Sequence, residues 1–301
     1  MSFAVETAGL RYSPGSGFEL HALDLHIPRG TIYGFLGPNG SGKTTTIRLI
    51  LGLLRPLAGR ITVLDRTIPD HSSQVLARIG YVPEAPHFDP TLTVREILRF
   101  QAAFYPSWDH AWAENLLAQF ELDDRKPFGA LSKGQKAKLM MLTVLAERPE
   151  LLILDEPTDG LDPVARRDIL AALLEYVTTG TASVLISSHL VHELERICGW
   201  VGVMDQGRLV TESSMERLKD GMKRLTIANA PTELPEAPFR LLSRKSVDGT
   251  ETWTVRDWEP AMTRWFPEHS IELRRVVDLD LEEGFVELLR AFRVERQLGA
   301  L

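Results

Sequence analysis

This chain of 301 residues contains one cysteine, Cys198, and no apolar run that approaches the about 20 residues needed to span a bilayer. A lone cysteine excludes an internal disulfide and is typical of a reducing compartment, so we interpret Cys198 as a small buried side chain. The longest apolar stretches, Leu49–Leu54 and Leu139–Ala146, have the length of ordinary helix faces. Residues 1–6 lack the basic start and apolar stretch of a signal peptide. We expect a cytoplasmic protein that reaches a membrane only through a partner.

An excess of positive charge is also missing. Lys and Arg number 34 against 41 Asp and Glu, which gives a net charge of −7 and argues against a nucleic-acid-binding surface. The proportions of hydrophobic residues (44%) and charged residues (25%) are those of a soluble globular protein. A chain of this length holds a large core in one or two domains.

The most specific pattern is the run Gly37-Pro38-Asn39-Gly40-Ser41-Gly42-Lys43-Thr44, a full match to the phosphate-binding loop G-x-x-x-x-G-K-[ST]. The glycines let successive backbone N–H groups point at phosphate oxygens. Lys43 is placed to reach the β- and γ-phosphates, and the Thr44 hydroxyl to ligate Mg²⁺. Residues 31–36 predict a buried strand before the loop, and residues 45–51 predict a helix whose N-terminus faces the anion. The loop in this context predicts nucleotide binding.

A pair of carboxylates follows the apolar run Leu151–Leu154, which is typical of a strand buried in a parallel sheet. In isolation, Asp155 and Glu156 would most simply be a solvated pair at a strand end. In a chain that also contains a phosphate loop, one carboxylate can bind Mg²⁺ and the other can polarise the water that attacks a γ-phosphate. We therefore interpret Asp155 as a metal ligand, direct or through water, and Glu156 as the general base.

A second anion-binding helix start is predicted at Ser132-Lys133-Gly134-Gln135. Ser132 is a suitable N-cap, and Gly134 allows a ligand to approach the backbone closely. Taken alone, this element is only a capped helix.

Together these elements resemble the ATP-binding-cassette (ABC) ATPases of ABC transporters. The phosphate loop, the Leu-Ser-x-Gly-Gln signature, the Asp-Glu strand tip and His189 occur in the family's order, and the resemblance covers roughly residues 3–216. It implies two subunits that face head to tail and trap two ATP molecules with Mg²⁺, so that the signature residues act on the partner's γ-phosphate. The residues implied to bind ATP within one subunit are Tyr12, Gly37, Pro38, Asn39, Gly40, Ser41, Gly42, Lys43, Thr44 and Thr45.

The resemblance also assigns single residues. His189 matches the switch histidine that contacts the γ-phosphate and forms the catalytic group with Lys43 and Glu156, although a lone histidine is more often a surface or capping residue. Tyr12 matches the aromatic residue that stacks on adenine, against the alternative of a strand-packing tyrosine. Asp162, in Gly160-Leu161-Asp162, matches the aspartate that crosses the dimer interface and couples the two sites.

Two positions depart from the family pattern. Glu84 replaces the usual glutamine after the Tyr-Val-Pro strand. Its carboxylate keeps an oxygen ligand for metal or water but adds a charge near the triphosphate. Lys133 stands where glycine is frequent. Its charge lies either near the trapped phosphates or in solvent, and we favour solvent.

The expected fold class is α/β: a P-loop ABC-type nucleotide-binding domain with a mixed β-sheet core, an antiparallel β subdomain and a helical insertion. We place this domain at 1–216 and the helical subdomain at about 87–147, with helices over Thr93–Tyr105, Asp109–Phe120 and Ser132–Glu147. Later segments alternate between strand and helix patterns, which indicates a sheet with crossover helices. Residues 217–301 form a small C-terminal α+β appendage whose role the sequence leaves open.

The function implied by the resemblance is an ATP-hydrolysing subunit that drives a separately encoded permease at the inner face of the cell membrane, most consistent with export. The subunit would act as a homodimer or with a related subunit, without nucleic acid. One or two aromatic residues of the helical insertion near Glu84 are candidates for the groove that receives the permease. The alternatives are a translation or repair factor, disfavoured by the single set of motifs, and a regulatory cassette that does not hydrolyse ATP. The aromatic residues in question are Phe88, Phe104, Tyr105, Trp108 and Trp112.

Overall fold

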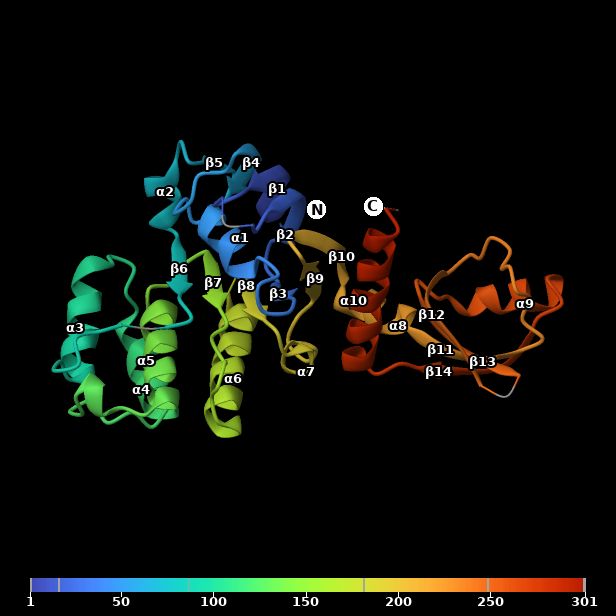
Figure 1. The fold of residues 1–301 in the computed structure, drawn as a ribbon. Coiled ribbons are helices and arrows are strands. Elements are labelled where there is room, and N and C mark those ends of the chain that lie inside the picture. The colour runs from blue at the N-terminus through green and yellow to red at the C-terminus, as the bar shows by residue number, and fades with distance from the viewer. Residues whose placement is uncertain (1, 16, 86, 181, 248, 300–301) are drawn as a thin grey trace. The chain divides into compact units, whose positions relative to one another are not determined.

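The computed structural model, drawn in Figure 1, describes residues 2–15, 17–85, 87–180, 182–247 and 249–299. The chain forms two compact units. The first comprises Met1–His189 with Gly202–Leu209, and the second comprises Leu190–Val201 with Val210–Leu301. The domain boundary that we placed after residue 216 stays a prediction.

The centre of the first unit is a largely parallel sheet. Neighbouring strands β3, β8, β7 and β6 run parallel, and every residue of β3, β7 and β8 is buried. Helices cover both faces of a parallel sheet, so its strands are buried on both sides and consist of continuous apolar runs. Since the three central strands are adjacent and parallel, the segments that follow them meet at one edge. The strand order is β10 (Arg208–Ser214), β9 (Trp200–Asp205), β3 (Ile32–Leu36), β8 (Ser183–Ser188), β7 (Leu151–Asp155) and β6 (Ile79–Val82).

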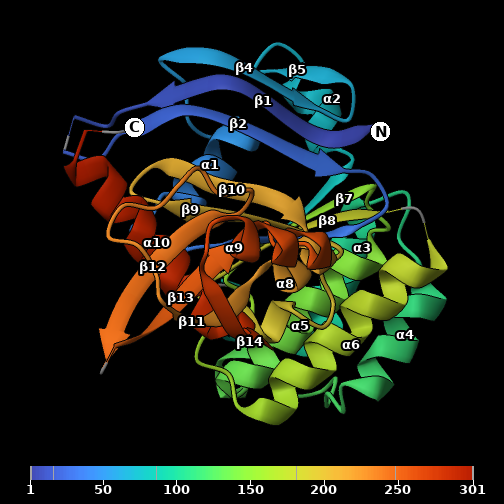
Figure 2. The same cartoon turned by 90° about the vertical axis from the view of Figure 1, so that its right-hand side faces the viewer.

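A second sheet of the first unit is antiparallel and forms a separate layer above α1 (Lys43–Ile50) in Figure 2. It confirms the expected antiparallel β subdomain. A short helix, α2 (Ser72–Leu76), connects this sheet to β6 and was not predicted. The strand order is β2 (Leu20–Pro28), β1 (Phe3–Tyr12), β4 (Ala58–Val63) and β5 (Arg66–Ile68).

The helical insertion contains α3 (Val94–Phe104), α4 (His110–Gln119), the single turn η1 (Phe128–Ala130) and α5 (Lys133–Ala146). The predicted caps are in place. Thr93 and Ser132 each accept a hydrogen bond from the backbone three residues later, and Glu96 and Gln135 return one, which makes two capping boxes. A cap of this kind is worth about 1 kcal/mol, so the sequence fixes where these helices begin. Helix α5 packs on β6 and on α6 (Pro163–Thr179), which ties the insertion to the central sheet.

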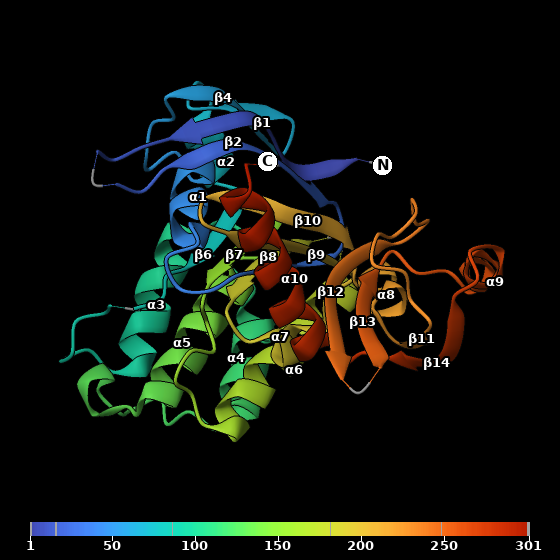
Figure 3. The same ribbon diagram turned by 45° about the vertical axis from the view of Figure 1, so that its right-hand side comes forward.

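The second unit is built on an antiparallel sheet, seen in Figure 3, whose order is β12 (Arg240–Val247), β13 (Thr250–Arg256), β11 (Lys223–Ala228) and β14 (Glu272–Asp278). Its core is rich in aromatic rings. The rings of Phe239 and Phe266 stack with centroids 5.7 Å apart, and Trp253 is fully buried. The expected α+β character is present. The remaining elements are α7 (Val191–Leu194), α8 (Met215–Gly221), η2 (Pro260–Arg264), α9 (Trp265–Glu268) and α10 (Leu281–Gln297).

Four strands of the structure, β5, β10, β11 and β12, were not predicted from the sequence. Strands β10 and β12 lie at the ends of their sheets, where charged and polar residues protect the open edge and weaken the alternating pattern. Cys198 is buried, as predicted, and burial raises the pKa of its thiol. In the described parts of the chain, no helix combines the length and apolar character that a membrane crossing needs.

Candidate nucleotide-binding site

The phosphate loop connects the end of β3 to the start of α1. Gly42 is the N-cap of α1 and has φ = 112°, a left-handed conformation that side chains rarely adopt. At Gly37 a Cβ atom would collide with the backbone carbonyl of Met204. The geometry of the loop therefore requires glycine at both positions.

Lys43, the first residue of α1, is folded back over the loop. Its side chain is only 5% exposed, and Nζ donates a 2.7 Å hydrogen bond to the Gly37 carbonyl. The same Nζ lies 3.1 Å from Oε1 of Glu156. A buried cation needs an anionic or carbonyl partner. A bound phosphate would therefore replace the Gly37 carbonyl and the Glu156 carboxylate as the partner of Lys43.

Asp155 and Thr44 bring two oxygen ligands together. The Thr44 hydroxyl donates a 3.1 Å hydrogen bond to Oδ1 of Asp155, and the hydroxyl of Ser187 donates to the same oxygen at 2.8 Å. Asp155 is 1% exposed, because it is the last residue of β7 and lies opposite Ser187 of the neighbouring strand β8. Hard oxygens of this kind fit Mg²⁺, which is typically held by one or two protein ligands together with water and substrate phosphates. No cluster of three or more His, Cys, Asp or Glu that could hold a metal occurs among the described residues.

Glu156 lies between two basic side chains. Its Oε1 faces Lys43, and its Oε2 lies 2.9 Å from Nδ1 of His189. The residue has φ = 49°, an unusual value for a side-chain-bearing residue, and its N–H donates to Ser187 Oγ at 2.9 Å. Strained backbone of this kind is concentrated at functional sites. The structure thus brings together Lys43, Glu156 and His189, the three residues predicted to form the catalytic group.

A cavity of about 620 Å³ opens over the loop. Tyr12, the predicted adenine-stacking residue, is not among the residues that line it, and is a half-buried residue opposite Leu20 at the end of β1. Phe18 does line the cavity, and a Cβ at Gly42 would lie 2.7 Å from its Cζ. The only signal for Phe18 in the sequence is an aromatic residue in the loop before β2. The cavity is lined by Phe18, Asn39, Gly40, Gly42, Lys43, Thr44, Thr45, Glu84, Glu156, Asp159 and His189.

The signature residues lie elsewhere. None of Ser132–Gln135 lines this cavity. Gly134 packs closely on α6, since a Cβ there would lie 2.9 Å from Cβ of Ala165. The Lys133 side chain is 64% exposed, and with Glu84 it lines a neighbouring cavity of about 340 Å³.

Asp162, the predicted coupling residue, is the N-cap of α6. Its Oδ1 accepts hydrogen bonds from the N–H groups of Ala165 and Val164 at 2.9 and 3.0 Å. The bond from Ala165 is the main reason that the pKa of Asp162 lies below its usual value. The carboxylate is therefore held at the start of α6.

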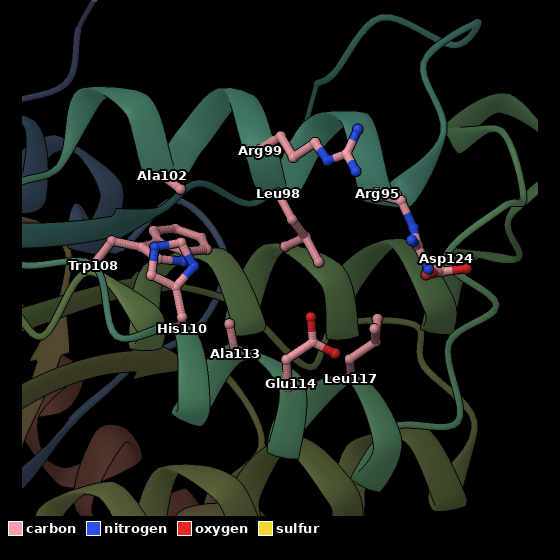
Figure 4. A pocket seen from close by; sticks show the side chains of 10 residues that line it. All are labelled: Arg95, Leu98, Arg99, Ala102, Trp108, His110, Ala113, Glu114, Leu117 and Asp124. Atoms are coloured by element: carbon pink, nitrogen blue, oxygen red, sulfur yellow. The ribbon is translucent and has the colours of Figure 1, made fainter.

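A further cavity, of about 310 Å³, lies between α3 and α4, and Figure 4 shows Arg99 and Glu114 on its two sides. Trp108 is the only one of the five aromatic residues of the insertion that lines it. None of the five lines either cavity that contains Glu84. Phe104 is 64% exposed on α3, in ring contact with Phe100. The cavities at Glu84 are therefore not lined by these aromatic residues, and the groove for the permease stays a prediction.

Comparisons with known proteins agree with this geometry. Residues 20–159 match the family model described as ABC transporter. The chain is 31% identical over 300 residues to the bacitracin transport ATP-binding protein BcrA of Bacillus licheniformis, covering 96% of this chain and 98% of that protein. It is 36% identical over 221 residues to the Nod factor export ATP-binding protein I of Cupriavidus pinatubonensis, covering 72% of this chain and 68% of that protein.

Solved structures show the same fold. An ATP-binding subunit of an ABC transporter superposes with a TM-score of 0.64 at 30% identity, covering 71% of this chain and 91% of that one. The cbiO1 protein of Clostridium perfringens, part of the transporter complex cbiONQ, gives 0.62 at 28% identity, with coverage of 72% and 90%. The resemblance seen in the motifs is therefore confirmed, and the chain belongs to the ABC transporter family as an ATP-binding, ATP-hydrolysing cassette.

Proposed function

We propose that this chain is the ATPase subunit of an ABC exporter, bound through a separate permease to the inner face of the cell membrane. The observation that carries the proposal is the position of Glu156, between Lys43 and His189 and next to Asp155. A carboxylate placed in this way is suited to take a proton from water beside a bound triphosphate.

In the proposed reaction, Lys43 binds the β- and γ-phosphates, and the backbone N–H groups of the loop hold their oxygens. The water oxygen forms a new bond to the γ-phosphorus, the bond from that phosphorus to ADP breaks, and Glu156 takes the water proton. His189 holds Oε2 of Glu156 in place and contacts the γ-phosphate. Thr44 and Asp155 would hold Mg²⁺, whose charge offsets the negative charge of the phosphates.

A head-to-tail dimer completes the proposed site. None of Ser132–Gln135 lines the cavity over their own phosphate loop, which supports this arrangement. The start of α5, with Ser132 as its cap, is suited to an anion that another subunit presents. Closure on ATP and opening after hydrolysis would drive the permease, since the contacts between subunits exist only in the closed state.

The names of the relatives support transport out of the cell. One is a Nod factor export protein, and BcrA is a bacitracin transport protein that matches nearly all of this chain, including the second unit. We propose an exporter on this basis, with either a second copy or a related subunit as the dimer partner.

A reconstitution experiment tests the proposal. The chain carrying Glu156→Gln would be bound to native membranes with ATP, and the integral membrane protein recovered with it would be reconstituted in vesicles with the wild-type chain. We expect Mg²⁺-dependent ATP hydrolysis that the membrane protein stimulates. Absence of hydrolysis by the wild-type chain would overturn the ATPase assignment, and recovery of no membrane protein would overturn the role in transport.

A further inference from the structure

Strand β14 forms one edge of the sheet in the second unit (Figure 3). It pairs with β11 on one side, and among the described residues no strand pairs with its other side. An open edge presents N–H and C=O groups to which a further strand can bind. Two valines near the end of β14 are exposed as well, Val276 by 39% and Val277 by 38%. This edge is therefore a candidate surface for the addition of a strand.

The ladder with β11 indicates which backbone groups of β14 face outward. The N–H of Leu279, directly after β14, donates a hydrogen bond to the carbonyl of Met222, directly before β11. In an antiparallel ladder, hydrogen-bonded and non-hydrogen-bonded pairs alternate. Asp278 and Val276 stand one and three positions before Leu279, so each belongs to a non-hydrogen-bonded pair with β11. The N–H and C=O groups of Asp278 and Val276 therefore point to the open side.

The charges of β14 select one register for a pair of antiparallel copies. A pair centred on Val276 places this residue opposite itself, and it places Arg274 of each copy opposite Asp278 of the other. Sliding one copy by two residues in one direction opposes Glu272 with Asp278, which are like charges, and in the other direction opposes Val276 with Asp278. Opposite charges across two strands stabilise their pairing, and like charges destabilise it.

The two charged groups that would meet are accessible. The Asp278 side chain is 90% exposed, although its Oδ1 lies 2.7 Å from Nζ of Lys223. The Arg274 side chain is 50% exposed and lies 3.1 Å from Glu272 within its own strand. Exposed ion pairs of this kind contribute little to stability, so they leave both groups available to a second strand.

A bulge limits the length of the pairing. The register between β14 and β11 shifts between Thr226 and Ile227, which makes Arg274 an extra residue of β14. Bulges and charged side chains commonly protect a sheet edge against unspecific pairing. In β14 they confine the regular part of the edge to residues 275–278, and the opposite signs of Arg274 and Asp278 favour a single partner register.

We propose that β14 is a self-association surface, to which a second copy of this chain adds its own β14 antiparallel, with Val276 on the two-fold axis. A two-fold interface uses the same surface of both copies, and the strand centred on Val276 meets this condition. The pair spans residues 274–278 of each copy, less than a standard interface, so we expect weak and reversible association. None of these residues lines the cavity over the phosphate loop, and the contact therefore needs no nucleotide.

Disulfide formation tests the register. The sequence contains one cysteine, Cys198, which is buried, so Val276→Cys adds the one exposed thiol. In the proposed pair the two Cα atoms at position 276 lie about 5.5 Å apart, within the range of a disulfide. Val277→Cys is the matched control, because its exposure is equal and its counterpart lies on the diagonal, at about 7–8 Å.

Without nucleotide and under mild oxidation, we expect Val276→Cys to form covalent dimers at least about tenfold faster than Val277→Cys, because only position 276 meets its own copy within disulfide range. Equal rates for the two variants, or no covalent dimer of Val276→Cys, would overturn the proposal.

A charge at the centre of the strand should prevent the association. Val276→Lys opposes two like charges and should raise the dissociation constant of the nucleotide-free dimer at least about tenfold, measured by sedimentation equilibrium. Val286→Lys, at a residue of α10 that is 40% exposed, is the matched control and should leave the constant unchanged. Arg274→Glu should also weaken the dimer, and Arg274→Glu combined with Asp278→Arg should restore it. Thermal unfolding of each variant identifies a folding defect.

Measurement without nucleotide separates this inference from the proposed function. A wild-type chain that stays monomeric at about 100 μM without nucleotide, or a Val276→Lys chain that associates like wild type, would overturn the inference. If Glu156→Gln still forms an ATP-dependent dimer in that case, the proposed function stands. A nucleotide-free dimer of a chain that does not hydrolyse ATP would have the opposite meaning.

Discussion

The hydroxyl of Thr44 donates a 3.1 Å hydrogen bond to Oδ1 of Asp155, although 111 positions separate the two residues in the sequence. The contact arises because α1 starts at the same sheet edge at which β7 ends. It places two hard oxygen ligands side by side before any nucleotide is bound, so the protein part of the proposed metal site is already formed.

Removal of the Thr44 hydroxyl should weaken the response to magnesium. For Thr44→Ala we expect the Mg²⁺ concentration that gives half-maximal ATP hydrolysis to rise about tenfold, since one of two protein ligands is lost. The measurement is a magnesium titration of the ATPase rate. Thr44→Ser is the matched control, because it keeps the hydroxyl and should retain most of the wild-type response. An unchanged titration for Thr44→Ala would contradict the assignment.

Glu156→Gln should lower ATP hydrolysis at least about 100-fold, the usual contribution of a general base. ATP binding should persist, because Lys43 and the loop are intact, so the variant should accumulate as an ATP-bound dimer detectable by size-exclusion chromatography. Glu175→Gln, on an exposed turn of α6, controls for loss of a carboxylate. A glutamine variant that hydrolyses ATP at the wild-type rate would show that Glu156 is not the base.

The subunit that supplies the signature residues can be identified with mixed dimers. One dimer carries Ser132→Ala in one subunit and Glu156→Gln in the other, and a second dimer carries both changes in the same subunit. If Ser132 acts in trans, the first dimer keeps one intact site and about half the wild-type rate, and the second has none. The control is internal, because both dimers contain the same two substitutions. The opposite order of rates would contradict the composite site.

Glu84→Gln should leave ATP affinity within about twofold of wild type, since the Glu84 side chain is exposed at the edge of the cavity and its charge is screened by solvent. The expected change lies in the rate of hydrolysis and in its stimulation by the permease. Fluorescent nucleotide titration gives the affinity. A loss of affinity greater than about tenfold would instead identify Glu84 as a required metal ligand.

Glu147, at the end of α5, should make stability depend on pH. Burial raises the pKa of its carboxyl from the usual 4.5 to about 8, and a hydrogen bond with Tyr105 opposes part of this rise. Between these two values the folded chain holds a proton that the unfolded chain has released. The free energy of unfolding should therefore fall as pH rises from about 4.5 to about 8, by up to about 1.4 kcal/mol per pH unit.

Glu147→Gln, which is neutral at every pH, should remove this component of the slope. Urea unfolding at a series of pH values from 5 to about 8.5 measures it, and Glu175→Gln is again the exposed control. If the free energy of unfolding changed with pH in the same way for wild type and Glu147→Gln, Glu147 would have the same pKa in the folded and unfolded chains.

The local elements of the site were predictable because their causes are local. The loop 37–44 needs glycine for its backbone, Ser132 and Thr93 cap the helices that follow them, and the apolar run before Asp155 forms a buried strand. Each depends on residues within a few positions of one another, and a single sequence carries that information.

Tertiary structure decided what these elements contact. The adjacency of β3, β8 and β7 brings Lys43, Glu156 and His189 together, and no spacing in the sequence states that adjacency. Phe18 lines the cavity because the loop that carries it folds over Gly42, and the stacking role of Tyr12 stays a prediction. Asp159 meets Lys133 only because α5 and the segment after β7 lie side by side. The sequence by itself determined which chemistry the chain carries, and strand order and loop packing decided which side chains share the site, because those contacts join residues far apart in the chain.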